Sequence, residues 1–370
     1  MNQVKEKVQV YSEYLSTYLA ILNLPSNKFE EIHIYEPLAG EGEDKIEGKD
    51  KIFDGSVKQA FPIIEGNNKN RPDKPNRIKY FINDKNTKKH NKLKESFLTP
   101  DSQEWLRIYN TDAQTFINER LQDIKGKNIH SLWFVDPCGY TQVKKEDYKK
   151  IFNDLGQKAE LLIFVPLIYI IRFLAALDNK KVSGVADFLK DWDINRDELP
   201  ANHKPQDFEK LLVSKMKKLF PNKYIKSYSL ALNDRPQDFF SLIFISSNIF
   251  GADKFLEAGE RIFKKTRHGL SFGGERYNEK DALSKLKGFI EERPRNNVEL
   301  YEWGIDNDFY PVKMKELLDT LYRQGDLARF SYHDRNKRAS HNYINHDLYA
   351  QSKIGDESAF KTLFTIGSLF

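Results

Sequence analysis

Two glycines stand in the turn EPLAGEG at 36–42, directly after a short apolar run, and this turn is the strongest local sign of chemistry in the sequence. Glycine lets the chain leave a strand sharply and lets the backbone approach a ligand closely. The turn lacks the third glycine of a dinucleotide-binding fingerprint, so a purely structural role is equally open. Glu36, Ala39, Gly40 and Gly42 are therefore candidate cofactor-binding residues.

Acids or amides end the next three apolar runs as well. Asn83 and Asp84 end the first of these runs, Asp112 the second and Asp136 the third. Because the carboxyl ends of parallel strands meet at one edge of an open α/β sheet, we expect these side chains to surround one site. An acid after the second strand suits a ribose diol, and a polar side chain after the third suits an adenine edge. Asp84 and Asp112 thus predict an adenosyl cofactor, with a solvated or helix-capping carboxylate as the alternative for each acid.

The same apolar runs predict the sheet that this arrangement needs. They are continuous rather than alternating, as in strands buried on both faces of a parallel sheet, and helical patterns lie between them. An amphipathic helix is predicted over about 5–23. Two later strand patterns with a short polar connection predict an antiparallel hairpin. The predicted strands cover 32–40, 78–84, 105–113, 131–139, 160–167, 224–233 and 238–248.

A parallel sheet that closes with an antiparallel hairpin is the arrangement of class I methyltransferases. We therefore predict a Rossmann-like sheet of this class in a domain over residues 1–272. From residue 277 to 370 the pattern changes to three helices and two strand-like runs joined by DRNKRAS, which is the plan of a winged helix. Basic side chains on or beside this predicted wing are candidate nucleic-acid contacts, unless they form only a solvated surface. They are Arg329, Arg335, Lys337 and Arg338.

Short motifs in a fixed order give a resemblance to a known family. The turn at 36–42 is similar to the DPFxGxG turn, and DPCGY at 136–140 to the DPPY motif, of amino-methyltransferases that act on nucleic acids. In more detail, residues 8–272 resemble the three-Cys-motif partner family (TcmP), which consists of methyltransferase-like bacterial proteins. The resemblance also covers the helical leader, a helix start at 55–57, an apolar strand running into Arg172, and the segment Gly269-Leu270-Ser271-Phe272.

The resemblance implies a function and the residues that carry it. It implies S-adenosylmethionine as the cofactor and an exocyclic amine of a base in DNA or RNA as the target. Asp136 and Pro137 would accept hydrogen bonds from that amine, and Tyr140, one residue later than the aromatic of the motif, would stack on the base. The resemblance also makes a three-Cys-motif protein a candidate partner. Departures from the family pattern occur at Glu36, Val57 and Cys138.

Two alternatives stay open. Cys138 follows a proline at a strand end, where cytosine-C5 methyltransferases place a nucleophilic thiolate, although the next strand, FVPLIY, lacks their Glu-Asn-Val partner. A small buried cysteine is the favoured interpretation. The second alternative is a non-catalytic nucleic-acid-binding partner protein that retains the fold, which the irregular EPLAGEGED turn favours.

Composition narrows the function classes further. The 370 residues carry 59 basic and 54 acidic side chains, a net charge of +5 that hints only weakly at a polyanion. The longest apolar run, 161–171, is about half the length of a membrane span, and the N-terminus has no signal-peptide pattern, so a cytoplasmic location is expected. A single cysteine excludes an internal disulfide. The scattered histidines show no HExxH or CxxC spacing, so no metal site is expected.

Overall fold

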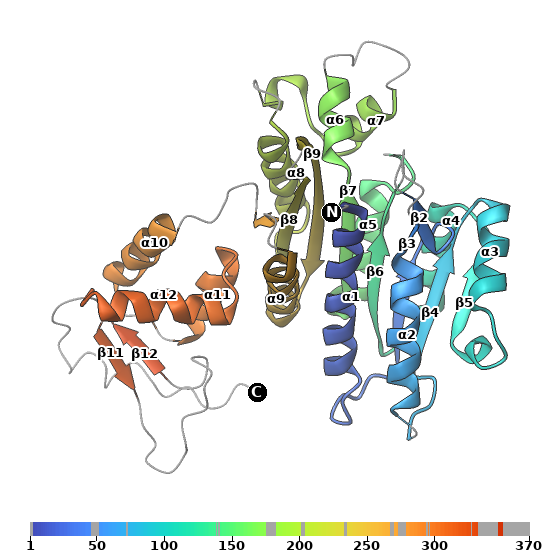
Figure 1. Cartoon of the computed structure of the whole chain (residues 1–370), viewed down its shortest axis with the longest axis horizontal. Helices are drawn as coiled ribbons and strands as arrows, with labels where there is room; N and C mark the ends of the chain where they lie inside the picture. The colour runs from blue at the N-terminus through green and yellow to red at the C-terminus, as the bar shows by residue number, and fades with distance from the viewer. Residues whose placement is uncertain are drawn as a thin grey trace. The chain divides into compact units, whose positions relative to one another are not determined.

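The chain divides into two compact units, residues 1–276 and 277–370, which we call unit 1 and unit 2 (Figure 1). Within the described ranges, every helix is too short or too polar to cross a bilayer. The computed structural model describes residues 3–45, 52–71, 73–137, 139, 141–174, 183–200, 204–232, 235–266, 270–272, 279–293, 295, 297–326, 328–331 and 347–350.

Unit 1 is built on one eight-stranded sheet with the order β10-β8-β9-β7-β6-β1-β4-β5. Five neighbouring strands are parallel: β7 (Ala159–Val165), β6 (Ile129–Val135), β1 (Glu31–Glu36), β4 (Ile78–Asn83) and β5 (Leu106–Tyr109). The antiparallel strand β9 (Arg235–Ser246) lies between β7 and β8 (Tyr224–Leu232), and β10 (Leu270–Phe272) continues the sheet beyond β8. This is the Rossmann-like arrangement of class I methyltransferases, as predicted.

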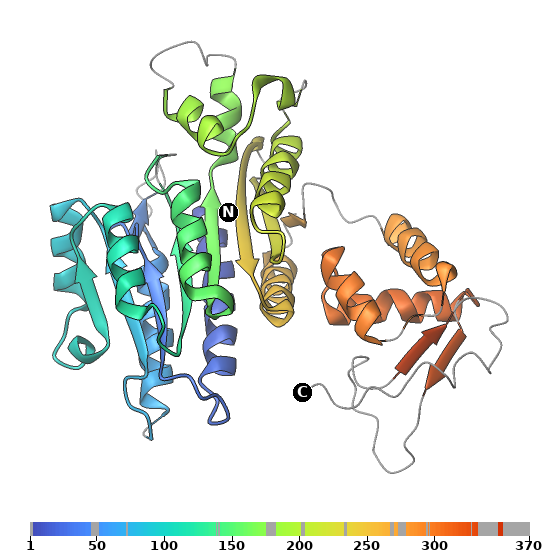
Figure 2. The ribbon, with the colours of Figure 1, turned by 180° about the vertical axis from the view of Figure 1, so that it is seen from behind.

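Helices cover both faces of this sheet. In Figure 1, α1 and α2 lie in front of the strands, and the opposite view in Figure 2 shows α4, α5 and α8 in front. The helices of unit 1 are α1 (Gln3–Leu22), α2 (Ser56–Lys69), α3 (Thr87–Phe97), α4 (Ala113–Ile124), α5 (Lys145–Leu155), α6 (Leu167–Leu174), α7 (Ser183–Asp191), α8 (Pro205–Leu219) and α9 (Ile249–Thr266).

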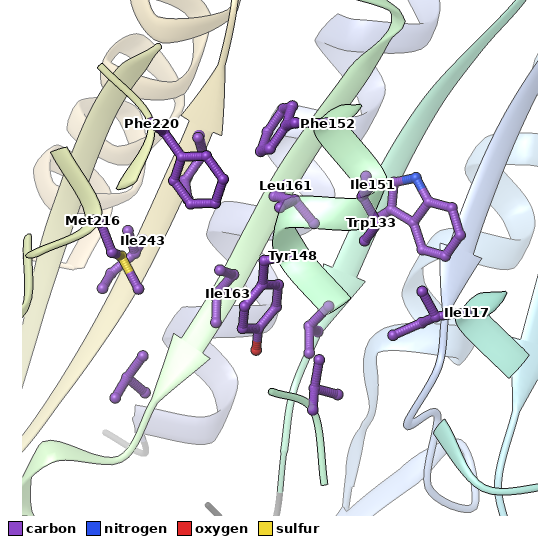
Figure 3. Close-up of a cluster of buried hydrophobic side chains, with 14 of the residues drawn as sticks. Ile117, Trp133, Tyr148, Ile151, Phe152, Leu161, Ile163, Met216, Phe220 and Ile243 are labelled. Atoms are coloured by element: carbon purple, nitrogen blue, oxygen red, sulfur yellow. The ribbon is translucent and has the colours of Figure 1, made fainter. Parts of the chain in front are cut away.

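The apolar runs at the centre of the sheet, β6 and β7, are continuous because both of their faces are covered. All seven residues of β6 and all seven of β7 are buried. On one face, Trp133, Leu161 and Ile163 pack with side chains of α5 and α8 in a large hydrophobic cluster (Figure 3). On the other face, the Tyr11 ring of α1 stacks on Phe134 with the ring centres 4.1 Å apart.

Two elements of unit 1 differ from the sequence-based expectation. The apolar run at 161–171 contains the end of β7 and the start of α6, so Arg172 lies in a helix and not at the end of a strand. The chain changes conformation at Pro166, whose ring fixes φ and whose nitrogen cannot donate to a ladder. In addition, residues 43–54 contain a small antiparallel hairpin, β2 (Glu43–Lys45) and β3 (Ile52–Asp54), which the sequence did not reveal.

Unit 2 contains three helices followed by two paired strands. The helices are α10 (Glu279–Glu292), α11 (Asn297–Asp306) and α12 (Pro311–Arg323), and the strands are β11 (Ala328–Ser331) and β12 (Asp347–Ala350). Apolar side chains of all three helices, among them Leu286, Leu300 and Leu317, form a buried core. The expected second wing strand at 341–345 and the connecting DRNKRAS segment lie outside the described residues, so the winged helix stays a prediction.

Candidate active site

The parallel strands β1, β4, β5 and β6 all end at the same edge of the sheet, which we call the carboxyl edge. The topology therefore brings together the chain segments that follow them: the glycine turn at 37–42, Asp84, Asp112 and Asp136-Pro137. Strand register alone accounts for this assembly, since each segment leaves the sheet next to its neighbour.

Asn83, at the end of β4, ties three of these segments together. Its fully buried side-chain amide donates to the carbonyl oxygens of Pro37 (2.9 Å) and Thr111 (3.0 Å). Its side-chain oxygen accepts from the backbone N–H of Thr111 (3.0 Å), and its own carbonyl accepts from Ala39 N (2.8 Å). Asn83 is thus a positioning residue for the glycine turn. The sequence marked it as a polar strand end but did not reveal these contacts.

The two glycines of the turn have different roles. Both have left-handed backbone angles, with φ of +68° at Gly40 and +81° at Gly42, where other residues are strained. A Cβ atom on Gly42 would lie 2.9 Å from Cε2 of Phe97, so Gly42 also serves close packing. A Cβ atom on Gly40 would meet no heavy atom within 4 Å. Of the two, Gly40 therefore leaves its backbone accessible to a ligand.

The β2–β3 hairpin returns the chain to the glycine turn. Gly55 N donates to the carbonyl oxygen of Gly42 (2.9 Å), and α2 begins at the next residue, Ser56. A Cβ atom on Gly55 would lie 2.9 Å from the carbonyl carbon of Gly42, so glycine is needed for this approach. Residues 43–54 thus separate the turn from α2 along the sequence but not in space. The N-terminus of α2 lies beside the turn, where its free N–H groups favour an anionic group.

Acids in the glycine turn and directly after it are paired with lysines. Glu41 and Glu43 lie 3.4 Å and 3.2 Å from Nζ of Lys92 in α3. Lys58 of α2 lies 3.5 Å from Glu43. These cations offset negative charge that would otherwise repel the carboxylate of an amino-acid-type cofactor.

Glu36 lies beneath the turn and is almost completely buried, with 1% of its surface exposed. Tyr11 and Tyr80 donate hydroxyl hydrogen bonds to its Oε1 (2.9 Å and 2.5 Å), and Ser56 donates to its Oε2 (2.6 Å). Burial, partly offset by these donors, raises the pKa of Glu36 from 4.5 to about 7. Glu36 therefore joins α1, α2 and β4 to the end of β1. A contact between Glu36 and a cofactor stays a prediction.

The raised pKa of Glu36 predicts a specific pH dependence of stability. The unfolded chain loses this proton near pH 4.5, whereas the folded protein keeps it to about pH 7. The stability contributed by the protonated carboxyl is therefore fully present at low pH and is lost as the pH rises through this window. Relative to Glu36→Gln, the wild-type free energy of unfolding should fall by about 2–3 kcal/mol between about pH 5 and about pH 8.

Urea unfolding of both proteins at the two pH values measures this difference. Glu119→Gln, at an exposed glutamate of α4, should follow the wild type. If the free energy of unfolding of the wild type and of Glu36→Gln depended on pH in the same way, the raised pKa of Glu36 would be contradicted.

Asp136, at the end of β6, is paired with a residue that the sequence did not identify. Lys7 of α1 donates through Nζ to Oδ2 of Asp136 (2.5 Å), and its side chain is only 8% exposed. The same ammonium lies 4.3 Å from the centre of the Phe164 ring, a cation–π distance. Helical spacing places Lys7 one turn before Tyr11, so α1 supplies one contact to Asp136 and one to Glu36. The second oxygen of Asp136, Oδ1, accepts no hydrogen bond from the described residues.

The other predicted residues are placed as follows. The Oδ1 atom of Asp84 accepts from Asn86 N (2.8 Å) in a local turn, and its side chain is half-buried at the carboxyl edge. Asp112 caps α4: its two oxygens accept from the backbone and hydroxyl of Thr115 (3.0 Å and 2.7 Å), and these bonds lower its pKa. The capping alternative thus applies to Asp112. Cys138 and Tyr140 lie outside the described residues.

The predicted nucleic-acid contacts in unit 2 are described only in part. Arg329 lies in β11, in register with Tyr349 of β12. Arg335, Lys337 and Arg338 lie outside the described residues. Among the described residues, histidine, cysteine and acidic side chains form no group of three that could hold a metal ion.

No family model and no curated protein matches the sequence. Among solved structures, the chain is similar to protein LPL1258 from Legionella pneumophila str. Philadelphia 1, assigned to the family model DUF519 (TM-score 0.43, 12% identity, 72% of this chain and 95% of that one). It is also similar to human methyltransferase-like protein 13 in complex with SAH (TM-score 0.37, 9% identity, 76% of this chain and 99% of that one). A third similar structure is the plantazolicin methyltransferase BpumL in complex with SAH (TM-score 0.33, 11% identity, 66% of this chain and 85% of that one).

Proposed function

We propose that this protein is an S-adenosylmethionine-dependent methyltransferase that acts on an exocyclic amine of a nucleic-acid base. One observation carries the proposal: the carboxyl edge of a class I methyltransferase sheet brings the accessible Gly40 backbone together with Asp84 and Asp136. The resemblance to the TcmP family supports it through the order of the motifs.

The residues of the turn fit an adenosyl cofactor with an amino-acid tail. The Gly40 backbone and the N-terminus of α2 would approach the tail, since a Cβ atom on Gly40 would meet no described heavy atom within 4 Å and the nearby acids are paired with Lys92. The Oδ2 atom of Asp84 would accept from the ribose hydroxyls, and Asp112 would lie at the adenine edge. When bound, S-adenosylmethionine supplies an electrophilic methyl group on a sulfonium centre.

Asp136 and Pro137 would hold the target amine. The Oδ1 atom of Asp136 and the carbonyl oxygen of Pro137 would each accept one N–H, which orients the nitrogen lone pair toward the methyl group. Lys7 holds Oδ2 of Asp136 and so fixes the plane of the carboxylate. The gain in rate comes from positioning and from exclusion of water more than from proton transfer.

A second function is favoured by a separate observation. Lys7 already donates to the carboxylate that would bind the target amine. In a non-catalytic partner protein that binds nucleic acid through the same fold, Lys7 would stay bound to Asp136 permanently. In both functions a three-Cys-motif protein is a candidate partner, and the cytoplasm is the expected location.

Transfer of a tritiated methyl group to single-stranded DNA and RNA oligonucleotides tests the proposal. We expect label on an exocyclic nitrogen of adenine or cytosine, and we expect Cys138→Ala to retain this activity. Label at carbon 5 of cytosine that is lost in Cys138→Ala would contradict the amine assignment in favour of the thiolate chemistry. Binding of S-adenosylhomocysteine without any transfer would favour the non-catalytic alternative.

A further inference from the structure

Three lysines at the start of helix α3 have no partner among the described residues. Lys88 and Lys89 lie in its first turn and Lys85 directly precedes its N-cap residue, Asn86. Lys85 and Lys88 are exposed and Lys89 is half-buried. Among the described residues, none of these three side chains forms a hydrogen bond or ion pair, whereas Lys58, Lys69 and Lys92 nearby in the chain pair with acids. We call Lys85, Lys88 and Lys89 the α3 lysine cluster.

The position of the α3 lysine cluster works against the stability of the helix. The N-terminal end of a helix carries partial positive charge, so a lysine there lowers the stability of the helix. The first turn of α3 contains no acid that would offset this charge. Lys88 and Lys92 lie at an i,i+4 spacing, at which like charges also destabilise a helix. An anionic ligand would offset both the unfavourable interaction with the helix end and the repulsion between the lysines. A surface that serves only solubility would gain nothing from lysines at the start of a helix.

The α3 lysine cluster borders the candidate active site. Lys88 and Lys89 lie one helical turn before Lys92, on the same face of α3. Lys92 contacts Glu41 and Glu43 of the glycine turn and the hairpin that follows it. Lys85 is also the immediate neighbour of Asp84, the predicted ribose ligand. A bound polyanion on this face would therefore pass close to the carboxyl edge.

We propose that the α3 lysine cluster binds the phosphate backbone of the nucleic-acid substrate. The inference rests on the proposed function and adds the surface along which the strand would run. A base must leave its stack to be methylated, so a single strand or a locally opened strand is the expected ligand. Lysine ammonium groups bind phosphates as point charges without reading sequence, which suits this task.

Anisotropy of a labelled single-stranded DNA oligonucleotide over a salt series tests the proposal. In Lys88→Ala/Lys89→Ala, two phosphate contacts are lost, so the slope of log affinity against log salt should fall by about 1.4, at about 0.7 per phosphate. Affinity at roughly 0.1 M salt should fall about 3- to 10-fold. The matched control is Lys217→Ala/Lys218→Ala, which removes two adjacent exposed lysines in the last turn of α8.

The control pair lies at the opposite edge of the sheet, because α8 leads into β8, which runs parallel to β7. It should keep the wild-type slope, and both variants should bind S-adenosylhomocysteine like the wild type. Equal salt slopes for the α3 variant and the α8 control would overturn the α3 assignment. It would also be overturned if Arg335→Ala/Lys337→Ala/Arg338→Ala alone removed the whole salt slope. If the wild type binds S-adenosylhomocysteine but neither DNA nor RNA, the substrate class itself is wrong. Binding to vesicles of anionic lipid in place of oligonucleotides would also overturn the proposal.

Discussion

Asp136→Asn is expected to lower the rate of methyl transfer by about 10²–10⁴-fold, the loss typical of a group that positions a reacting atom. The carboxylate offers Oδ1 to the amine while Lys7 holds Oδ2. An asparagine has only one acceptor oxygen, so it cannot serve both donors. The nearly buried Lys7 ammonium will retain the oxygen, because an unpaired buried charge is costly. The side-chain amide then faces the target amine as a donor.

Single-turnover rates with a saturating oligonucleotide measure this loss, and calorimetry with S-adenosylhomocysteine should show unchanged cofactor affinity. Asp123→Asn, at an exposed acid of α4, provides the control and should retain the wild-type rate. A wild-type rate in Asp136→Asn would remove Asp136 from the site.

Gly40→Val is expected to lower the affinity for S-adenosylhomocysteine at least about 100-fold. In the free protein a Cβ atom at this position meets no heavy atom within 4 Å, so we expect the variant to fold. The cost is backbone strain, about 1–2 kcal/mol or more for a β-branched residue at φ of +68°. A bound cofactor would have to share the space that the valine occupies.

Gly126→Val separates strain from ligand contact. Gly126 has φ of +79° and no neighbour within 4 Å of an added Cβ atom, like Gly40, but it lies in the turn before β6, at the opposite edge of the sheet. Thermal unfolding should show similar destabilisation of both variants, whereas only Gly40→Val should lose the ligand. Retained affinity in Gly40→Val would place the cofactor elsewhere.

Local patterns in the sequence were sufficient to predict the sheet. The five apolar runs became the five parallel strands. Burial of both faces explains the continuous runs of β6 and β7, whereas β5 at the edge of the sheet is partly exposed. The predicted strand at 160–167 is β7, but the apolar residues that follow it form α6 and do not extend the strand to Arg172, since a continuous apolar run has no period that separates a buried strand from a buried helix. Pro166 was the local signal of the change.

The contacts that shape the site were beyond sequence reasoning because they join distant parts of the chain. Lys7 and Asp136 are separated by 129 positions, and their pairing depends on how α1 packs on β6. The return of Gly55 to Gly42 depends on a hairpin with no strong turn signal of its own. The residue type of Glu36 could not distinguish a ligand-binding carboxylate from the buried anchor of four elements that the structure shows. Strand ends could be located from sequence, and their buried partners could not.

Calorimetric titration of S-adenosylhomocysteine into the purified protein tests whether this carboxyl edge is a cofactor site. We predict saturable binding with one ligand per chain, retained in Gly126→Val and lost in Gly40→Val. S-adenosylmethionine should compete for the same site. Absence of binding to the folded wild-type protein at about millimolar ligand would contradict the account, because the site would then lack the methyl donor on which the proposed reaction depends.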